Sequence, residues 1–457
     1  MSAMISRRKF LFTASGLATA MILPESSHFR EKTGAVFKAG TGLAWLKFPT
    51  SSWPLEGYTG QHDPLAVRVL LMDDGRIRTG TAVVDTTSIS QDMVTIMKGI
   101  LFEVAQVHPH NSLIYASHTF SAPHILPSEH LPKDLSKSNL SIIIRSFEAA
   151  MREAATRAAN TLQPATIGFN SGISRINVNR DMPGKQGWWL QANDSGYSDS
   201  QLNVIRINNI KGEALAILIN YGVQSSITED VKLSNGNKLV SSDLAGAVSR
   251  NVEDHFDGKI VAFFLIGAAG DQSPIFQGNR CIIKEDGTQQ RIDIHEQAYT
   301  LLALLSDRLS GDVVRICDAI DGYSMPEIHI YRYSVKVPAL NFTPENAAKV
   351  PLSYFSYKPA GEADVPVMVM RIGKIAWVGL QPELAASIGE YIHRHSPFAL
   401  TLITTMLDGA AKYMPDAISY DRFTYEARSS PFAKGAAEQL SVVIISKLKK
   451  VKFIGSD

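Results

Sequence analysis

The sequence predicts an α/β fold with a mixed β-sheet core flanked by helices. Segments with helical periodicity alternate with short apolar runs typical of buried strands, and hairpin-like turns interrupt that alternation. One such turn, Asp73-Asp74-Gly75, separates two predicted strands at residues 67–72 and 81–84. A mixed sheet follows, because hairpins pair strands antiparallel whereas helical crossovers pair them parallel.

The remaining elements continue this alternation along the chain. Residues 92–107 have helical periodicity, and a longer helix at 140–161 ends before Gln163-Pro164. Residues 171–199, rich in Gly, Asn, Asp and Trp, are expected to form a long surface loop, and Gly40-Thr41-Gly42 a turn. Further helices are predicted at 243–256, 294–309, 383–393 and 431–449, and further strands at 113–117, 203–207, 214–220, 260–266, 328–337, 367–380 (two strands) and 400–406.

Composition and charge limit the class of protein. The chain has 457 residues, 45% hydrophobic and 19% charged, so it can bury a substantial core. Its formal net charge of +1 argues against a nucleic-acid-binding surface. Neither a clean linker nor an internal repeat divides residues 34–457, which are therefore expected to form one large domain. Cys281 and Cys317 match no metal-binding spacing, and the sequence leaves open whether they pair or stay free.

The N-terminus predicts export. Ser6-Arg7-Arg8-Lys9-Phe10-Leu11 precedes an apolar run at 12–23 and resembles a twin-arginine signal. The run is too short to span a bilayer as an ordinary helix, and residues 18–20 offer a small-residue cleavage site. Residues 1–33 are therefore interpreted as signal and linker. The mature protein is expected to be periplasmic or extracellular, with no transmembrane segment.

Polar, chemically useful residues follow three of the apolar runs. They are His118, then Asp271 with Ser273, and finally Glu383. Ligands of open α/β sheets bind beyond the carboxyl ends of the strands. If the three strands share one sheet, these side chains converge on one cleft. Common catalytic signatures, including Gly-x-Ser-x-Gly, His-Glu-x-x-His and the phosphate-binding loop, are missing, which weighs against an ordinary α/β-hydrolase.

Together these segments resemble a known family. From about Gly40 to Glu438 the chain is similar to the catalytic domain of neutral/alkaline non-lysosomal ceramidases, which are zinc amidases that split the N-acyl bond of ceramide. The resemblance implies an α/β domain, here without the C-terminal β-sandwich that such ceramidases often carry, because the chain ends soon after residue 427. The matching segments, in order, are 62–65 with Arg68, 117–123, 176–180, 218–224, 242–246, 267–274, 381–383, 413–415 and 425–427.

The resemblance also implies a zinc site. Carried over one position at a time, its ligands are His118, Gln224, Glu383 and Tyr425. Gln224 stands where relatives have a histidine, and Phe120 replaces a second histidine that supports catalysis. Catalytic zinc prefers imidazole and thiolate ligands, whereas a glutamine oxygen suits harder ions such as Ca²⁺ or Mn²⁺. We therefore expect weaker zinc binding, another divalent metal, or none.

Two functions follow from this resemblance. In the first, the chain is an exported metal-dependent hydrolase whose metal-activated water cleaves an N-acyl amide in a small-molecule or lipid-like, for example sphingolipid-like, substrate. Asp271 would then orient the loop, Arg180 bind substrate, and Ser273 contact it or act as nucleophile. In the alternative, the chain is a non-catalytic binding protein whose metal site is eroded at Gln224 and Phe120. An esterase or amidase with another substrate and metal lies between these two functions. Trp188-Trp189 could line a substrate mouth or pack against the core.

Overall fold

The computed structural model describes residues 36–124, 137–284, 286, 288–342 and 349–453. The predicted export signal lies outside these residues. Residues 36–457 group into one unit, to which the following description applies. Cys281 and Cys317 are both free thiols, which closes the question that the sequence left open. No helix among the described residues is long and apolar enough to cross a membrane.

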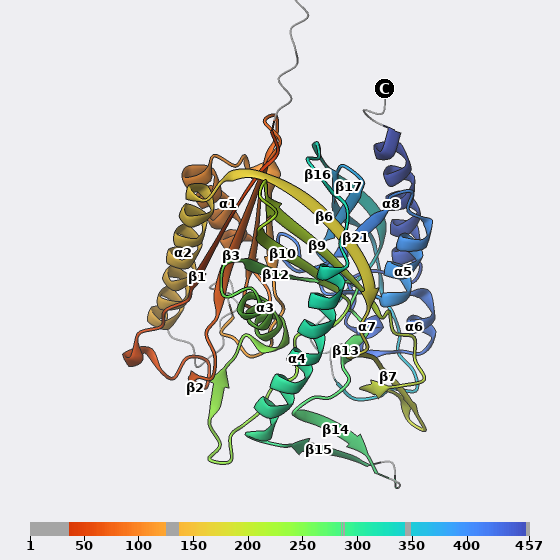
Figure 1. Cartoon of the computed structure of the whole chain (residues 1–457). Coiled ribbons are helices and arrows are strands. Elements are labelled where there is room, and N and C mark those ends of the chain that lie inside the picture. The colour runs from red at the N-terminus through yellow and green to blue at the C-terminus, as the bar shows by residue number, and fades with distance from the viewer. Residues whose placement is uncertain (1–35, 125–136, 285, 287, 343–348, 454–457) are drawn as a thin grey trace, which may run out of the picture. The chain divides into compact units, whose positions relative to one another are not determined.

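A large mixed sheet forms one part of the core (Figure 1). The pairs β4–β5 and β10–β12 are parallel, and the other neighbours along the sheet are antiparallel, which confirms the predicted fold class. In spatial order its strands are β12 (Val261–Ile266), β10 (Ala214–Tyr221), β9 (Gln201–Asn209), β6 (Gln163–Ile173), β1 (Lys38–Trp45), β3 (Ala66–Asp73), β4 (Arg78–Val84) and β5 (Ser112–Ala116), with the short β16 (Tyr323–Ser324) beside β6.

A second sheet carries the strand that leads to Glu383. Its order is β17 (Ile328–Leu340), β18 (Pro359–Ile372), β19 (Ile375–Leu380) and β21 (Leu400–Thr404). The condition that all three functional strands share one sheet is therefore not met. Their ends still meet, because the chain leaving β21 binds both neighbours. Thr405 N donates to Ile266 O of β12 at 3.0 Å, and Leu407 N donates to Leu380 O of β19 at 2.9 Å.

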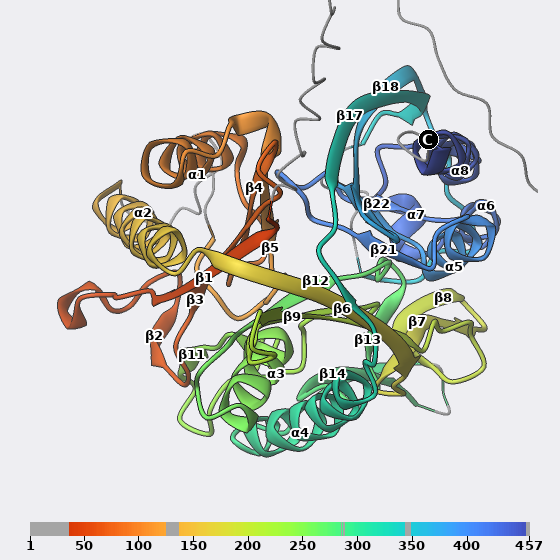
Figure 2. The same cartoon turned by 45° about the horizontal axis from the view of Figure 1, so that its top comes forward.

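Helices cover both sheets (Figure 2). One pair, α1 (Gln91–Ala105) and α2 (Lys137–Asn160), packs on the β1 half of the large sheet, while α3 (Asp243–His255) and α4 (Gln297–Asp318) pack beside its β12 half. On the second sheet, α5 (Ala386–His395) contacts β21 and α8 (Ala436–Phe453) contacts β17. The short α6 (Ala417–Asp421) and α7 (Tyr425–Arg428) lie between them in sequence.

Three local predictions were wrong. Residues 171–199 contain the hairpin of β7 (Asn177–Gly184) and β8 (Gly187–Asn193), because their polar residues are buried and bonded; Asn193 Nδ2, for example, donates to Asp181 O at 2.7 Å. Gly40-Thr41-Gly42 lies in β1, where a side chain at Gly42 would collide with the backbone of α2. Glu383 belongs to β20 (Glu383–Leu384), ahead of α5, and is not a first-turn helix residue.

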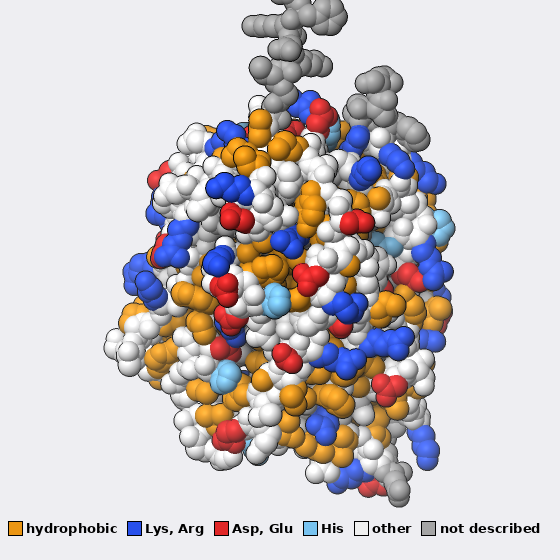
Figure 3. All heavy atoms as spheres, in the orientation of Figure 1, with side chains coloured by type: hydrophobic (Ala, Val, Ile, Leu, Met, Phe, Trp, Pro, Cys, Tyr) orange, Lys and Arg blue, Asp and Glu red, His pale blue; other side chains and the backbone are white. Residues whose placement is uncertain are grey.

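Charge is dispersed over the surface. On the face shown in Figure 3, basic and acidic side chains are interspersed. This agrees with the net charge of +1 and gives no extended basic surface on that face. Of the tryptophan pair, Trp189 is buried, and Trp188 lies under the guanidinium of Arg422 at 4.3 Å.

Candidate functional site

Three of the predicted metal ligands lie together. His118 follows β5 in a left-handed conformation (φ 60°), which is uncommon for a residue other than glycine and turns the chain sharply out of the sheet. Its Nε2 lies 3.1 Å from Glu383 Oε2. The side-chain nitrogen of Gln224 donates to the same carboxylate oxygen at 2.7 Å. The ends of β5, β10 and β19 thus bring these residues to one point.

His118 and Glu383 form a buried ion pair. Burial lowers the pKa of His118, but the neighbouring carboxylate brings that pKa above its usual value. Burial raises the pKa of Glu383, and the imidazole together with the Gln224 amide brings it below its usual value. The second ring nitrogen, Nδ1, lies 2.7 Å from Thr87 O. An imidazolium has two N–H donors, and both find an acceptor here.

The orientation of Gln224 is fixed by its neighbours. Arg180 Nη1 donates to Gln224 Oε1 at 2.5 Å. A guanidinium can only donate and a carboxylate can only accept, so the amide nitrogen must face Glu383 and the amide oxygen must face Arg180. The oxygen that would bind a metal is therefore turned away from His118 and Glu383.

Arg180, on β7, links the cluster to the end of the chain. Its Nε donates to Glu426 Oε1 at 2.7 Å, and its guanidinium lies over the Tyr413 ring at 5.2 Å. Burial and the neighbouring Glu426 raise the pKa of Asp181 well above its usual value. Nη2 of Arg180 is buried and makes no well-aligned hydrogen bond in the described part of the chain.

Asp271 and Ser273 occupy the exit from β12 and play different parts. Asp271 Oδ1 accepts a hydrogen bond from Ala386 N at 2.8 Å, at the start of α5, and its backbone oxygen accepts from Arg180 N at 3.0 Å. Burial raises the pKa of Asp271 to about 6. Ser273, on β13 (Gln272–Pro274), is 3% exposed, and its hydroxyl has no partner among the described residues.

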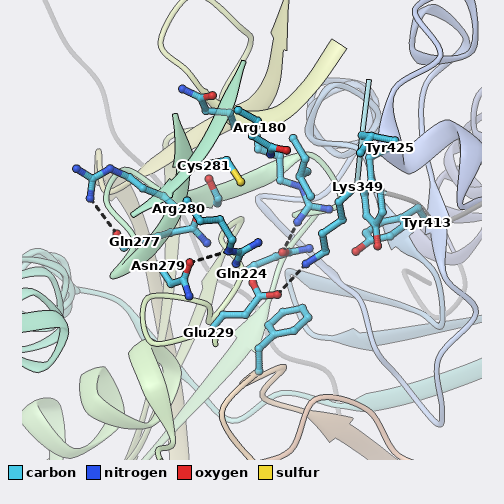
Figure 4. Close-up of a pocket in the computed structure, with 17 residues that line it drawn as sticks. Arg180, Gln224, Glu229, Gln277, Asn279, Arg280, Cys281, Lys349, Tyr413 and Tyr425 are labelled. Carbon is cyan, nitrogen blue, oxygen red and sulfur yellow. Dashed lines mark hydrogen bonds and ion pairs between the residues drawn. The ribbon is translucent and has the colours of Figure 1, made fainter. Parts of the chain in front are cut away.

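A cavity of about 280 Å³ opens beside this cluster (Figure 4). Phe120 and Gln224 line it, whereas His118 and Glu383 do not. The Phe120 ring packs edge-on against the His118 imidazole at 4.6 Å between centroids, and Gln224 bonds to Glu383. The two positions where the resemblance implied histidines therefore separate the ion pair from the cavity. Other residues of the inner wall are Arg180, Ser273, Tyr413 and Tyr425.

The two tyrosines stand differently toward the ion pair. Tyr425, the fourth predicted ligand, lines the cavity at the start of α7 and packs edge-on against Tyr413 at 5.7 Å. Tyr413 belongs to β22 (Tyr413–Met414), which pairs with β20 so that Tyr413 lies opposite Glu383. Sequence reasoning assigned no role to Tyr413 or to Glu426, although both stand in segments that carried the resemblance. Both residues hold Arg180 in place, Tyr413 through its ring and Glu426 through an ion pair.

As arranged, these side chains do not fit a zinc ion. A catalytic zinc site usually has three protein ligands and a water. No group of three or more His, Cys, Asp or Glu that could hold a metal ion occurs among the described residues. The imidazole and the carboxylate are committed to each other, and the Gln224 oxygen faces Arg180. Metal binding through Gln224 would require its side-chain amide to turn.

Comparison with known proteins shows the fold. No protein-family model matches the sequence, and no similar curated protein is found. Among solved structures, neutral ceramidase from Pseudomonas aeruginosa superposes with a TM-score of 0.70 at 16% sequence identity, covering 92% of this chain and 75% of that chain. A structure described as ceramidase complexed with C2 gives a TM-score of 0.69 at 16% identity with the same coverage. The described chain therefore has a fold like that of neutral ceramidase.

Proposed function

We propose that this chain is an exported, ceramidase-like hydrolase that cleaves an N-acyl amide bound in the cavity beside Arg180 and Ser273. The observation that carries this proposal is that residues from distant segments converge on one cavity, within a fold like that of neutral ceramidase. The amide belongs to a small-molecule or lipid-like substrate.

Two unpartnered polar atoms support a role in amide binding. Nη2 of Arg180 and Oγ of Ser273 are buried without well-aligned partners among the described residues. An unsatisfied buried polar group costs about 1–3 kcal/mol, and a ligand that supplies the partner removes that cost. An amide carbonyl oxygen can accept from both groups. As that oxygen becomes negative during attack, the fixed positive charge of Arg180 would stabilise it more strongly.

Activation of the attacking water is the step most affected by Phe120 and Gln224. The His118–Glu383 pair lies behind these two side chains, so a water in the cavity reaches the carboxylate only if one of them moves. The metal-dependent form of the proposal further requires Gln224 to turn its oxygen away from Arg180. A zinc ion, when bound, supplies an activated water.

The position of Phe120 and Gln224 between the ion pair and the cavity also favours a second candidate function, a binding protein without catalysis. Both departures from the family pattern stand between the ion pair and the cavity. The other residues of the inner wall are Arg180, Ser273 and the two tyrosines, whose side chains could contact an amide. The binding protein would therefore retain recognition and lack the means to activate water.

One experiment tests both candidates. The purified full chain is incubated with N-acyl amides and matched esters, with Zn²⁺, Mn²⁺ and Ca²⁺ supplied separately, and both fatty-acid release and binding by calorimetry are measured. Release that is lost in Ser273→Ala and Glu383→Gln, and retained in the exposed helix variant Arg308→Gln, supports the hydrolase. Binding without release under every metal supports the binding protein. Neither binding nor release refutes both.

A further inference from the structure

We propose that the amide ligand of this cavity carries an oxyanion, a carboxylate or a phosphate, which Arg291 recognises at the mouth. This inference rests on the proposed function and specifies its substrate class. It arises from a part of the chain that the sequence analysis left unassigned, the hairpin of β14 (Asn279–Ile283) and β15 (Gln289–Asp293).

The hairpin turns one face toward the cavity. In its register Cys281 lies opposite Arg291 and Asn279 opposite Asp293, so Asn279, Cys281 and Arg291 share a face. All three line the cavity. Arg280 lies opposite Ile292, on the other face. It borders the cavity, but its guanidinium extends away from Gln224 and Arg180 toward Gln277 O, at 3.5 Å (Figure 4).

Two cations that line the cavity, Arg280 and Arg291, form no ion pair with the described residues, and of these only Arg291 lies on the hairpin face that turns toward the cavity. Its Nε donates to the neutral Asn279 Oδ1 at 2.9 Å, and it forms no ion pair with the described residues. The neighbouring Lys349 is paired with Glu229 at 3.1 Å, and Arg180 is paired with Glu426 deeper in the wall. The two terminal nitrogens of the Arg291 guanidinium remain to bind an oxyanion side-on, the geometry that favours arginine over lysine.

The rest of the mouth is polar. Gln191, Gln277, Asn279 and Gln289 line the cavity in addition to Arg291. Side-chain amides can donate to an oxyanion, whereas they offer little to a hydrocarbon chain. A mouth with this lining fits the polar, charged end of a substrate. The acyl group is then left to the aliphatic and aromatic lining residues, which are Phe120, Leu190, Val350, Tyr413 and Tyr425.

A pair of ligands that differ only in charge tests this. N-lauroylglycine carries a carboxylate, N-lauroylglycinamide is its neutral counterpart, and N-lauroyl-phosphoethanolamine supplies the phosphate arm. Binding to the full chain is measured by calorimetry at low and high salt, together with amide cleavage. We expect the anionic ligands to bind about tenfold more tightly than the glycinamide, the effect of one charge-assisted hydrogen-bond pair, with the advantage shrinking in salt. The better of the two anionic ligands identifies the oxyanion.

Two arginine variants locate the effect. Arg291→Gln should remove the preference for anionic ligands and leave glycinamide binding unchanged. Arg280→Gln, which removes the same charge from the opposite face of the same hairpin, should keep the preference. The charge reversal Arg291→Glu should reverse it. Equal affinity for glycine and glycinamide ligands, or equal losses in the two glutamine variants, overturns the inference and leaves the proposed function standing. Binding of no ligand in the series overturns both.

Discussion

The polar groups on the two sides of the inner wall differ in how completely they are hydrogen-bonded. Behind the wall, His118 contacts Glu383, and Gln224 of the wall donates to the same carboxylate. On the cavity side, Ser273 Oγ and Arg180 Nη2 are buried without well-aligned partners among the described residues. A native interior rarely leaves such atoms unpaired, and each instance needs a reason. Under the proposed function, the first group stabilises the protein and the second group binds the ligand.

The largest test of this contrast is Glu383→Ala. Removing the carboxylate leaves two buried donors, His118 Nε2 and the Gln224 amide, without their acceptor, so we expect the free energy of unfolding to fall by about 2–6 kcal/mol. Urea unfolding at neutral pH measures the loss. Glu103→Ala is the control, because Glu103 is 64% exposed and pairs with Arg152 at the surface, where an ion pair contributes little to stability. Similar losses in both variants would show that the pair behind the wall is not structural.

Restoring two imidazoles should convert the sealed side into a metal site. The double variant Gln224→His with Phe120→His adds nitrogen donors beside His118 and Glu383 and frees Arg180 from the amide. At a zinc concentration about a hundredfold above its dissociation constant, bound metal would stabilise the variant by about 2.7 kcal/mol. Metal analysis and thermal unfolding with and without zinc measure this, with the wild type as control. A wild type that already holds stoichiometric zinc would contradict the arrangement described for Gln224.

The pH dependence of stability should expose Asp271. Its folded pKa, about 6, lies above the unfolded value, so the folded state holds a proton that the unfolded state releases first. The contribution of Asp271 to the free energy of unfolding is therefore expected to fall by about 1–3 kcal/mol as the pH rises from about 4 to about 6, and to stay constant above that range. Asp271→Asn keeps an acceptor for Ala386 N and should lack this fall. If the free energies of unfolding of the wild type and of Asp271→Asn change equally with pH, the raised pKa of Asp271 is contradicted.

The smallest change in stability is expected for Ser273→Ala. The hydroxyl has no partner among the described residues, so its removal should alter the free energy of unfolding by less than about 1 kcal/mol. Ligand binding or turnover should nevertheless fall, since the cavity loses a donor. Ser249→Ala is a matched control, because the Ser249 hydroxyl is also buried but donates to Ala245 O at 2.8 Å. A larger destabilisation at Ser273 than at Ser249 would contradict its assignment to the ligand side.

Local patterns predicted most of the framework. Strands such as β3, β4 and β12 and helices such as α1 and α3 have the apolar periodicity of their structures, and the fold class was confirmed. Packing decided what periodicity could not. β1 was missed because its two glycines are read locally as a turn, whereas they are needed for the close approach of α2. β7 and β8 were missed because their buried polar residues look like loop residues until their partners are known.

The sequence predicted which residues come together in the candidate site, but not how their side chains are oriented. The resemblance brought His118, Gln224 and Glu383 forward, and the structure places them in contact. That Gln224 would turn its oxygen to Arg180 depends on Arg180 lying beside it, and these residues are 44 positions apart in sequence. The role of the β14–β15 hairpin had no motif at all. The pairing register of its two strands decides which side chains face the cavity, and that register is not apparent from the sequence.

The inner wall draws its parts from segments as distant as Phe120 and Tyr425, with Arg180, Ser273 and Tyr413 between them. The cavity therefore forms only when these distant segments have folded together, and a ligand can bind only to the folded domain. Any compound that fits will shift the melting temperature upward by mass action. A compound library can thus be screened by thermal unfolding, and the compounds that raise the melting temperature identify the chemical class of ligand that the cavity binds.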